Sequence, residues 1–223
     1  MKLRHEWKHE ITAADGRILS SRLSAAARRD CHGQNGQYEI RSLYFDDPQD
    51  TALREKLDGV ARREKFRIRY YDGNTSYICL EKKSKLDSLC GKRSVLLSLQ
   101  EVQALLNGVL DWMPHSGRPL VQELYWKMNT QGLRPKTIVD YTREAYVFPA
   151  GNVRITLDSN IRTGLRSTDF LNPACVTVPV GDSPLILEVK WDEFLPDVIR
   201  AAVQLPGRHT SAFSKYAACR VYG

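Results

Sequence analysis

The sequence predicts an α+β protein built around a largely antiparallel β-sheet, and two observations carry that prediction. About eight segments have the alternation or the β-branched and aromatic enrichment of strands, and helical segments are interspersed irregularly among them. Most of these strands place charged side chains on one face and apolar side chains on the other. The 223 residues contain no internal repeat and no linker-like segment, which favours a single domain over residues 1–223.

The composition, with 42% hydrophobic and 26% charged residues, is that of a soluble globular protein with a core. No apolar run approaches the ~20 residues of a membrane span, and the charged N-terminus does not resemble a signal peptide, so we expect a cytoplasmic protein. Five scattered cysteines argue against a disulfide framework and a cysteine zinc site. The net charge of +7 predicts a polyanionic partner: nucleic acid, a membrane surface or a phosphate-rich small molecule.

The first segment, RHEWKHEI (4–11), contains the letters of the H-E-x-x-H zinc motif at His5, Glu6 and His9. That motif needs a helix, but the sequence at 12–15 resembles a capping box, which starts a helix only afterwards. With a period of two, the segment instead becomes a strand with two unlike faces. The inner face carries Arg4, Glu6, Lys8 and Glu10, and the outer face carries His5, Trp7, His9 and Ile11.

The other elements follow in order along the chain. We expect a helix from 12 to about 29, a strand at 38–46, a short helix at 49–58, and a hairpin of strands 62–71 and 76–85 around Asp72-Gly73-Asn74. A weaker strand at 93–97 precedes helices at 100–113 and 118–130. Strands are expected at 136–147, 152–158 and 185–191, with a loop at 159–183 and a helical tail at 197–222 that breaks at Pro206-Gly207.

Charged residues recur at every second position of five strands. Beyond the first strand, these faces carry Lys65, Arg67, Arg69, Glu81, Lys83, Lys85, Arg154, Thr156, Asp158, Glu188 and Lys190. Solvent exposure explains one such face, but five favour a closed sheet whose charged faces line a lumen while helices pack outside. A lumen of this kind would bind a polyanion through arginine forks, and its carboxylates would hold Mg²⁺ or Mn²⁺ across phosphates.

Eight short segments occur in the order expected of a known family: RHEWKHEI, IRSLYFDD, KFRIRYY, CLEKKSK, DYTREAY, VRITLD, LILEVKW and FSKYAACR. The sequence resembles, over nearly its whole length, the VTC (vacuolar transporter chaperone) polyphosphate polymerase domain of the CYTH-like triphosphate tunnel metalloenzymes. The resemblance implies an eight-stranded antiparallel β tunnel, a closed barrel with helices packed outside. Such a tunnel binds triphosphate or polyphosphate with a divalent metal, Mn²⁺ or Mg²⁺.

The resemblance also assigns residues to the site. Its catalytic residues match Lys8, Arg67, Arg69, Lys83, Arg143, Arg154 and Lys215. The same residues would contact phosphate, with Lys82 and Lys190 as further phosphate contacts. The metal ligands would be Glu188, Glu6 and Glu81, although Glu81 is equally explained as an ion-pair partner that holds Lys83 or an arginine. Arg4 stands where the wider superfamily often has the first glutamate of E-x-E-x-K, which favours the polymerase branch over the hydrolases.

The function implied is a polyphosphate polymerase-like phosphotransferase. It would move the γ-phosphoryl group of a nucleoside triphosphate, with ATP as first choice, to a growing polyphosphate chain. Its partners would be the nucleotide, inorganic polyphosphate, and pyrophosphate or triphosphate. The alternatives are an inorganic or nucleoside triphosphatase and a non-catalytic polyphosphate-binding module. A nucleic-acid-binding domain is disfavoured, because no known binding signature is present and the basic residues alternate into one face.

Overall fold

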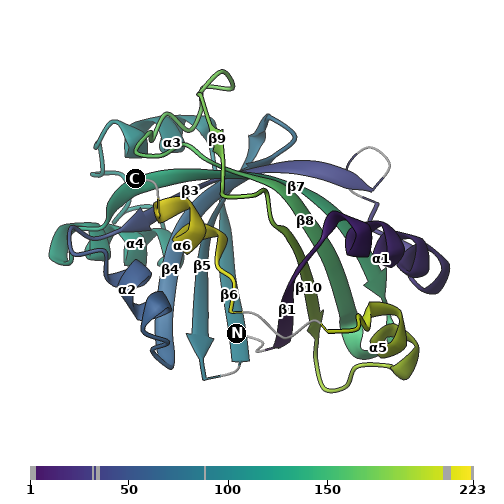
Figure 1. Cartoon of the computed structure of the whole chain (residues 1–223). Helices are drawn as coiled ribbons and strands as arrows, with labels where there is room; N and C mark the ends of the chain where they lie inside the picture. Colours follow the sequence, from purple (N-terminus) through teal and green to yellow (C-terminus); the bar gives the residue numbers. More distant parts are fainter. Residues whose placement is uncertain (1–3, 32, 34–35, 88, 208–211, 222–223) are drawn as a thin grey trace.

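The computed structural model of the chain describes residues 4–31, 33, 36–87, 89–207 and 212–221. Its strands form one antiparallel sheet with the hydrogen-bonded order β1-β10-β8-β7-β3-β4-β5-β6, while β2 pairs with β7 and β9 with β8 (Figure 1). The strands are β1 (His5–Ile11), β2 (Arg28–Arg29), β3 (Gln37–Asp46), β4 (Arg62–Tyr71), β5 (Asn74–Leu86), β6 (Leu89–Leu97), β7 (Arg134–Phe148), β8 (Val153–Thr163), β9 (Val178–Pro179) and β10 (Leu185–Trp191).

The sheet curls into an open tunnel, so the predicted closed eight-stranded barrel is wrong in two respects. The sheet has ten strands, because the two-residue strands β2 and β9 pair with its middle strands. Within the described residues, backbone pairing between the two ends of the sheet is limited to one bridge, between Arg4, which precedes β1, and Cys90 of β6, with N···O distances of 3.1 and 3.2 Å. Alternation defines the two faces of a strand but not the stagger between first and last strand on which closure depends.

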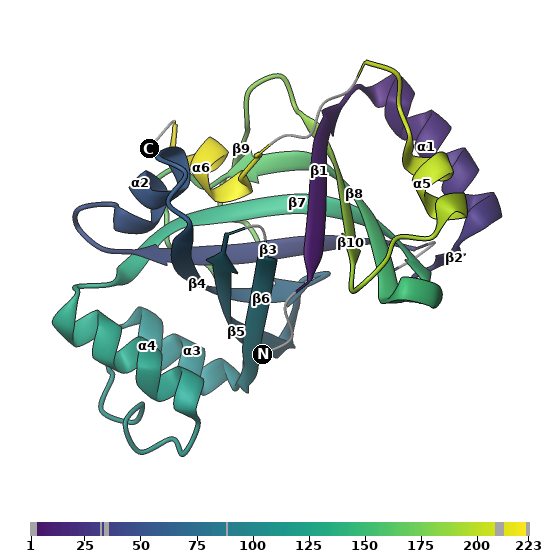
Figure 2. The ribbon, with the colours of Figure 1, turned by 90° about the horizontal axis from the view of Figure 1, so that it is seen from below.

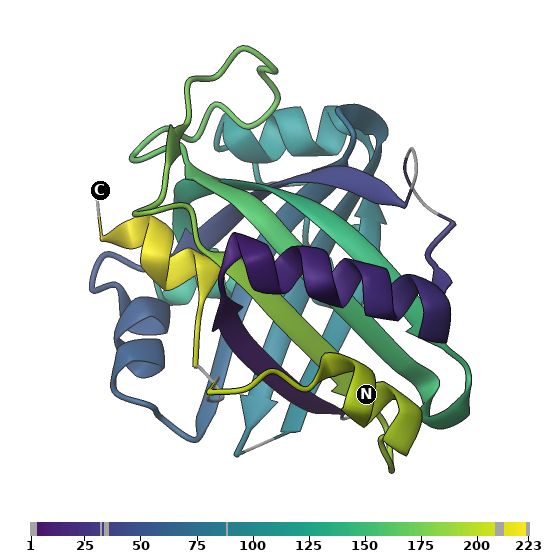
Figure 3. The ribbon, with the colours of Figure 1, turned by 45° about the vertical axis from the view of Figure 1, so that its right-hand side comes forward.

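Most helices cover the outside of the curled sheet, as predicted (Figures 2 and 3). Helix α1 packs with α5 over β8 and β10, where Leu19 and Ile199 are buried against Ile155. Helices α3 and α4 cover β4 and β5, where Leu124 is buried with Phe66. The helices are α1 (Ala13–Ala26), α2 (Thr51–Leu57), α3 (Leu99–Leu106), α4 (Pro119–Thr130), α5 (Asp197–Val203) and α6 (Lys215–Arg220), with a 3₁₀ turn, η1 (Ala150–Asn152).

Helix α6 departs from the prediction, because it packs against the inner face of the sheet. Its Tyr216 is buried and stacks on Tyr44 of β3, with ring centroids 5.0 Å apart. Its Cys219 is fully buried in the same cluster, which also contains Tyr141 of β7. The inner face therefore has an apolar portion that a helix covers, and this places Lys215, at the start of α6, inside the tunnel.

The start of α1 is a confirmed prediction. The Thr12 hydroxyl accepts a hydrogen bond from the backbone N–H of Asp15 at 3.2 Å, and the Asp15 carboxylate accepts one from the N–H of Thr12 at 3.0 Å. At Gly16 the helix approaches β10 so closely that a Cβ atom would lie 2.4 Å from Cδ2 of Leu185. The glycine therefore lets α1 lie close against the sheet.

Several element boundaries differ from the predictions. Helix α1 ends at Ala26, because the next residues pair with β7 as β2. Strand β8 continues to Thr163 into the predicted loop, and the helix predicted at 100–113 ends at Leu106. The predicted helical tail contains two short helices, and its residues 208–211 and 222 lie outside the described residues. The β4–β5 turn is confirmed, with positive φ angles at Asp72 and Gly73.

No helix in the described part of the chain combines the length and the apolar surface that crossing a bilayer would require.

Candidate phosphate-binding tunnel

A cavity of about 610 Å³ lies along the inner face of the sheet. Strands from both halves of the sheet, together with α2 and α6, contribute its walls. Among the described residues, fourteen basic side chains but three acidic residues line it. The basic residues are Arg4, Lys8, Lys56, Arg63, Lys65, Arg67, Arg69, Lys83, Lys85, Lys92, Arg143, Arg154, Lys190 and Lys215, and the acidic residues are Glu6, Glu64 and Glu188.

The two arginines predicted on β4 meet a carboxylate from the neighbouring strand. Arg67 holds Glu81 of β5 through Nε at 2.8 Å and Nη2 at 2.6 Å, while Arg69 lies 3.7 Å away. Lys92 of β6 approaches the other oxygen of Glu81 at 2.8 Å. Burial raises the pKa of Glu81, but Arg67 and Arg69 outweigh burial and hold that pKa far below its usual range. Both carboxylate oxygens are thus engaged by cations, and the pair orients the Arg67 guanidinium.

A second buried group joins β7, β8 and α6. Arg143 grips Asp158 with both arms of its guanidinium, at 2.6 and 2.8 Å, and the Lys215 Nζ lies 2.5 Å from the same carboxylate. Asp158 is fully buried. Burial raises its pKa, but Arg143 and Lys215 lower it further, to about 2. One carboxylate therefore anchors two of the predicted phosphate-binding cations, which come from segments distant in the sequence.

Two carboxylates approach each other where β1 pairs with β10. Glu6 and Glu188 lie within hydrogen-bonding reach, and each is nearly buried. Lys8 lies 2.9 Å from Glu6 and 3.7 Å from Glu188, and Lys83 and Lys190 approach Glu6 and Glu188 at 3.1 and 2.7 Å. Burial and the neighbouring carboxylate raise the pKa of Glu6, but Lys83 and Lys8 lower it more strongly. Both groups are therefore ionised at neutral pH, although they repel each other.

Arg154 of β8 completes the set of predicted cations that line the cavity. Its guanidinium donates to the Tyr38 hydroxyl at 2.9 Å and pairs with Asp30 at 2.6 Å. Asp30 follows directly after β2 and is 7% exposed. The short strand β2 therefore matters for the site, since it brings a carboxylate to the guanidinium group of Arg154.

The family model of the VTC domain matches residues 3–222. This chain belongs to the VTC domain family. The resemblance predicted from the eight sequence segments is therefore confirmed. None of the curated proteins matches the chain.

Solved structures share the fold of this VTC domain. One is a candidate adenylyl cyclase from Hippeastrum, HpAC1, described with a dominant triphosphatase activity; it is 14% identical, with 99% of this chain and 96% of that chain covered and a TM-score of 0.59. Another is the PH1012 protein from Pyrococcus horikoshii OT3, which is also 14% identical, with 95% and 96% covered and a TM-score of 0.54. Identities this low show a common fold alone.

Two predicted site residues, Lys82 and Glu81, are not among the side chains that line the cavity, and Lys82 lies on the other face of the sheet. Its ammonium group lies on the outer face, where it pairs with Glu123 of α4 and with Glu64, a residue that also reaches the cavity. Because neighbouring side chains of a strand point to opposite faces, Lys82 cannot share the inner face with Glu81 and Lys83. The phosphate contact predicted for Lys82 is thus not supported by its position.

Other cavity residues were not among the site residues that the resemblance assigned. Lys65 faces the cavity, where its Nζ donates to the Ser214 hydroxyl at 3.3 Å. The period of two along β4 had predicted this face for Lys65, but the resemblance gave it no role in the site. Lys56 of α2 had no such signal, because only the packing of α2 against β4 brings it to the cavity.

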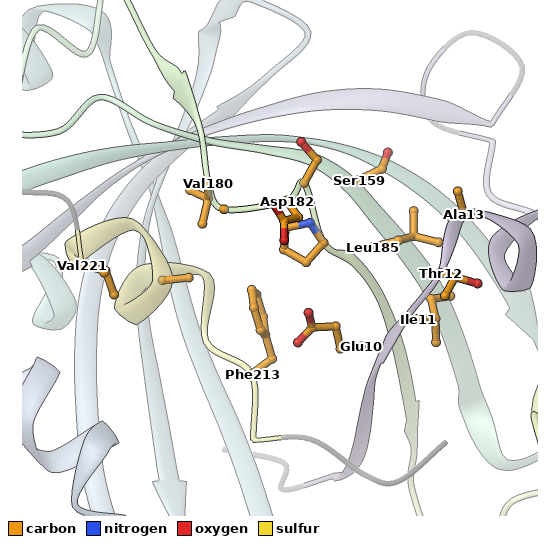
Figure 4. Close-up of a pocket in the computed structure, with 14 residues that line it drawn as sticks. Glu10, Ile11, Thr12, Ala13, Ser159, Val180, Asp182, Leu185, Phe213 and Val221 are labelled. Carbon is orange, nitrogen blue, oxygen red and sulfur yellow. The ribbon is translucent and has the colours of Figure 1, made fainter. Parts of the chain in front are cut away.

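A second cavity of about 600 Å³ lies beyond the end of β1 (Figure 4). Its walls are largely apolar, from residues such as Leu185 and Phe213, and its polar rim includes Glu10 and Asp182. Glu10 points to the same face of β1 as Glu6 and Lys8. It lies near the end of the strand, beyond the tunnel, and its side chain is exposed. The acidic rim of this cavity contrasts with the cationic tunnel, which is the cavity suited to a polyanion.

The residues of the H-E-x-x-H pattern lie on a strand and not on the helix that a zinc motif of this kind requires. His5 to His9 lie in β1, and His5 stacks on Trp191 with ring centroids 5.4 Å apart. Trp7 also contacts Trp191, edge to face at 4.6 Å, which confirms its predicted place on the outer face. Within the described residues, no three His, Cys, Asp or Glu side chains are grouped as a metal cluster.

Proposed function

We propose that this VTC domain binds a nucleoside triphosphate, with ATP as the first choice, and a polyphosphate chain in the tunnel, and transfers the γ-phosphoryl group to the end of that chain. The observation that carries the proposal is the large excess of basic over acidic side chains around one cavity. Cations held close together repel one another, and a polyanion relieves that repulsion by accepting their hydrogen bonds.

The carboxylate pair Glu6 and Glu188 fits a divalent metal better than the other predicted ligand. Both are ionised oxygen donors on the cavity wall, and such donors suit Mg²⁺ and Mn²⁺. Glu81 is less suited, because it does not line the cavity, and Arg67 and Lys92 engage its two oxygens behind the cavity wall. We therefore assign the metal to Glu6 and Glu188, and Glu81 to orienting Arg67. A metal bound there would neutralise phosphate charge.

The basic residues would then supply the remaining electrostatic stabilisation. Arg67, Arg69 and Arg143 would grip nonbridging phosphate oxygens, because their carboxylate partners hold the guanidinium groups facing the cavity. Lys8 and Lys215 would orient the γ-phosphoryl group and the attacking end of the chain. A terminal oxygen of the chain forms the new bond to phosphorus, and the bond to the β-phosphate oxygen breaks, releasing nucleoside diphosphate.

The low pKa values of the inner carboxylates favour transfer over hydrolysis. Hydrolysis needs a base that activates water, and a carboxylate with a depressed pKa is a weak base. The cations around Glu81 and Glu6 depress their pKa values. The end of a polyphosphate chain is already anionic and needs no base. The triphosphatase activity described for the Hippeastrum protein keeps hydrolysis as the second candidate.

The test is incubation of the purified protein with ATP and Mn²⁺, with polyphosphate, ADP and free phosphate measured separately. We expect growth of polyphosphate together with ADP. Free phosphate without chains would instead identify a triphosphatase, and tight polyphosphate binding without turnover would identify a binding module. Unchanged phosphate binding in Arg67→Ala and Arg154→Ala variants would contradict the tunnel assignment itself.

A further inference from the structure

Two pairs of like charges face each other at one end of the tunnel. In the β4–β5 ladder Arg63 lies directly opposite Lys85, and Lys65 lies directly opposite Lys83. All four side chains line the same cavity. Like charges placed directly opposite on antiparallel strands destabilise a sheet. Two successive repulsive pairs therefore indicate that something other than folding stability favours cations here.

The next pair of the β4–β5 ladder, further inside the tunnel, has opposite charges instead of like charges. The next inward pair is Arg67 with Glu81, whose charges are opposite and whose atoms approach to 2.6 Å. By contrast, no described carboxylate forms an ion pair with Arg63, Lys65 or Lys85. Inside the tunnel, Glu81 therefore balances part of the positive charge, whereas the end with Arg63, Lys65 and Lys85 keeps its positive charge.

Helix α2 adds a fourth cation, Lys56, to Arg63, Lys65 and Lys85 at this end of the cavity. Lys56 lines the cavity, and its pKa is lowered by burial and then by repulsion from Arg63, Lys8 and Lys85. Burial also lowers the pKa of Lys65, with further repulsion from Lys83 and Lys8. Both lysines line the cavity together with Arg63 and Lys85. We name Lys56, Arg63, Lys65 and Lys85 the mouth cluster.

We propose that the mouth cluster binds the extended part of a polyphosphate chain, beyond the terminal phosphates that Arg67, Arg69 and Arg143 would hold. The inference rests on the proposed function, because it assumes that the cavity holds phosphates. Cations that lie side by side on two neighbouring strands can both contact one linear anion that runs along the face of the sheet on which they lie. A triphosphate held at depth leaves the cluster unneutralised, whereas a long chain neutralises both regions. The protein would therefore prefer long chains to triphosphate.

The test compares the binding of inorganic triphosphate and long-chain polyphosphate to the full chain by calorimetry. The variant is Lys56→Ala/Arg63→Ala/Lys85→Ala, and the control is Arg62→Ala, since Arg62 is exposed and does not line the cavity. We expect the triple variant to lose about tenfold or more of its preference for the long chain, because three charge-assisted contacts disappear. The control variant should keep the preference of the unchanged protein.

A second measurement guards against misfolding. Without phosphate, the triple variant should unfold at a higher temperature than the unchanged protein, because the repulsive pair Arg63–Lys85 and the neighbouring charge of Lys56 are gone. If the unchanged protein binds triphosphate but the triple variant keeps its preference, the mouth cluster has no such role and the proposed function survives. If the unchanged protein binds neither polyanion, the proposed function fails and this inference fails with it.

Discussion

Two ionic groups on opposite faces of β5 show how one strand serves stability and binding separately. On the outer face, Lys82 is buried between Glu64 and Glu123 and fastens α4 to the sheet. On the inner face, the adjacent Lys83 approaches Glu6 in a cavity where basic side chains greatly outnumber acidic ones. The outer group is nearly balanced in charge and the inner group is not. Charge balance, more than the presence of charge, distinguishes a structural ionic group from a site for anions.

The largest expected effect comes from the carboxylate at the centre of the inner face. Asp158→Asn should lower the free energy of unfolding by about 3 kcal/mol or more, because Arg143 and Lys215 lose their buried partner. Chemical denaturation measures the loss. Triphosphate should restore much of the stability, since its oxygens replace the carboxylate charge. Equal loss with and without triphosphate would show that the anion does not reach these cations.

The same carboxylate predicts a dependence of stability on pH. Its folded pKa of about 2 lies below the unfolded value near 4, so its contribution is complete above about pH 4 and is lost as pH falls towards 2. We expect roughly 2 kcal/mol to disappear over that range, measured by denaturation at each pH. The Asp158→Asn variant should lack this part of the acid dependence, and an unaltered acid profile in the variant would contradict the assignment.

Adjacent lysines offer a matched pair of variants for the two faces. Lys82→Ala should cost about 1–2 kcal/mol of stability, because two partly buried carboxylates lose a shared partner. Lys83→Ala should leave stability nearly unchanged and weaken triphosphate binding about tenfold, because it removes one charge-assisted contact. Denaturation and calorimetry on both variants separate the effects. Comparable losses of triphosphate binding in the two variants would contradict the separate roles of the outer face in stability and the inner face in binding.

The smallest expected effect lies at the edge of the outer group. Arg93 pairs with Glu123, but its side chain is 44% exposed, so water screens the interaction. Arg93→Ala should change the free energy of unfolding by less than about 1 kcal/mol and leave phosphate binding unaltered. Thermal unfolding and calorimetry provide the check. A larger loss would mean that the outer group acts as a cooperative network.

Sequence periodicity predicted the faces of the strands well. Lys8, Arg67, Arg69, Lys83, Arg154, Glu188 and Lys190 all line the cavity, as their alternation or resemblance predicted. Lys82 was misplaced because the resemblance was followed at a position where the period of two excluded it. Asp30 was missed because β2 is two residues long and too short to show a period. Boundaries such as the end of β8 depended on pairing with β7 rather than on local preference.

The sequence by itself determined which side chains share a face, because a strand's geometry fixes alternation whatever surrounds it. It also determined the family, through segments spread along the chain. Only the tertiary structure decided that the sheet stays open between β1 and β6, that α6 enters the tunnel, and which cations have carboxylate partners. These features depend on strand stagger and on contacts between distant residues, such as Lys215 with Asp158, which local sequence does not encode.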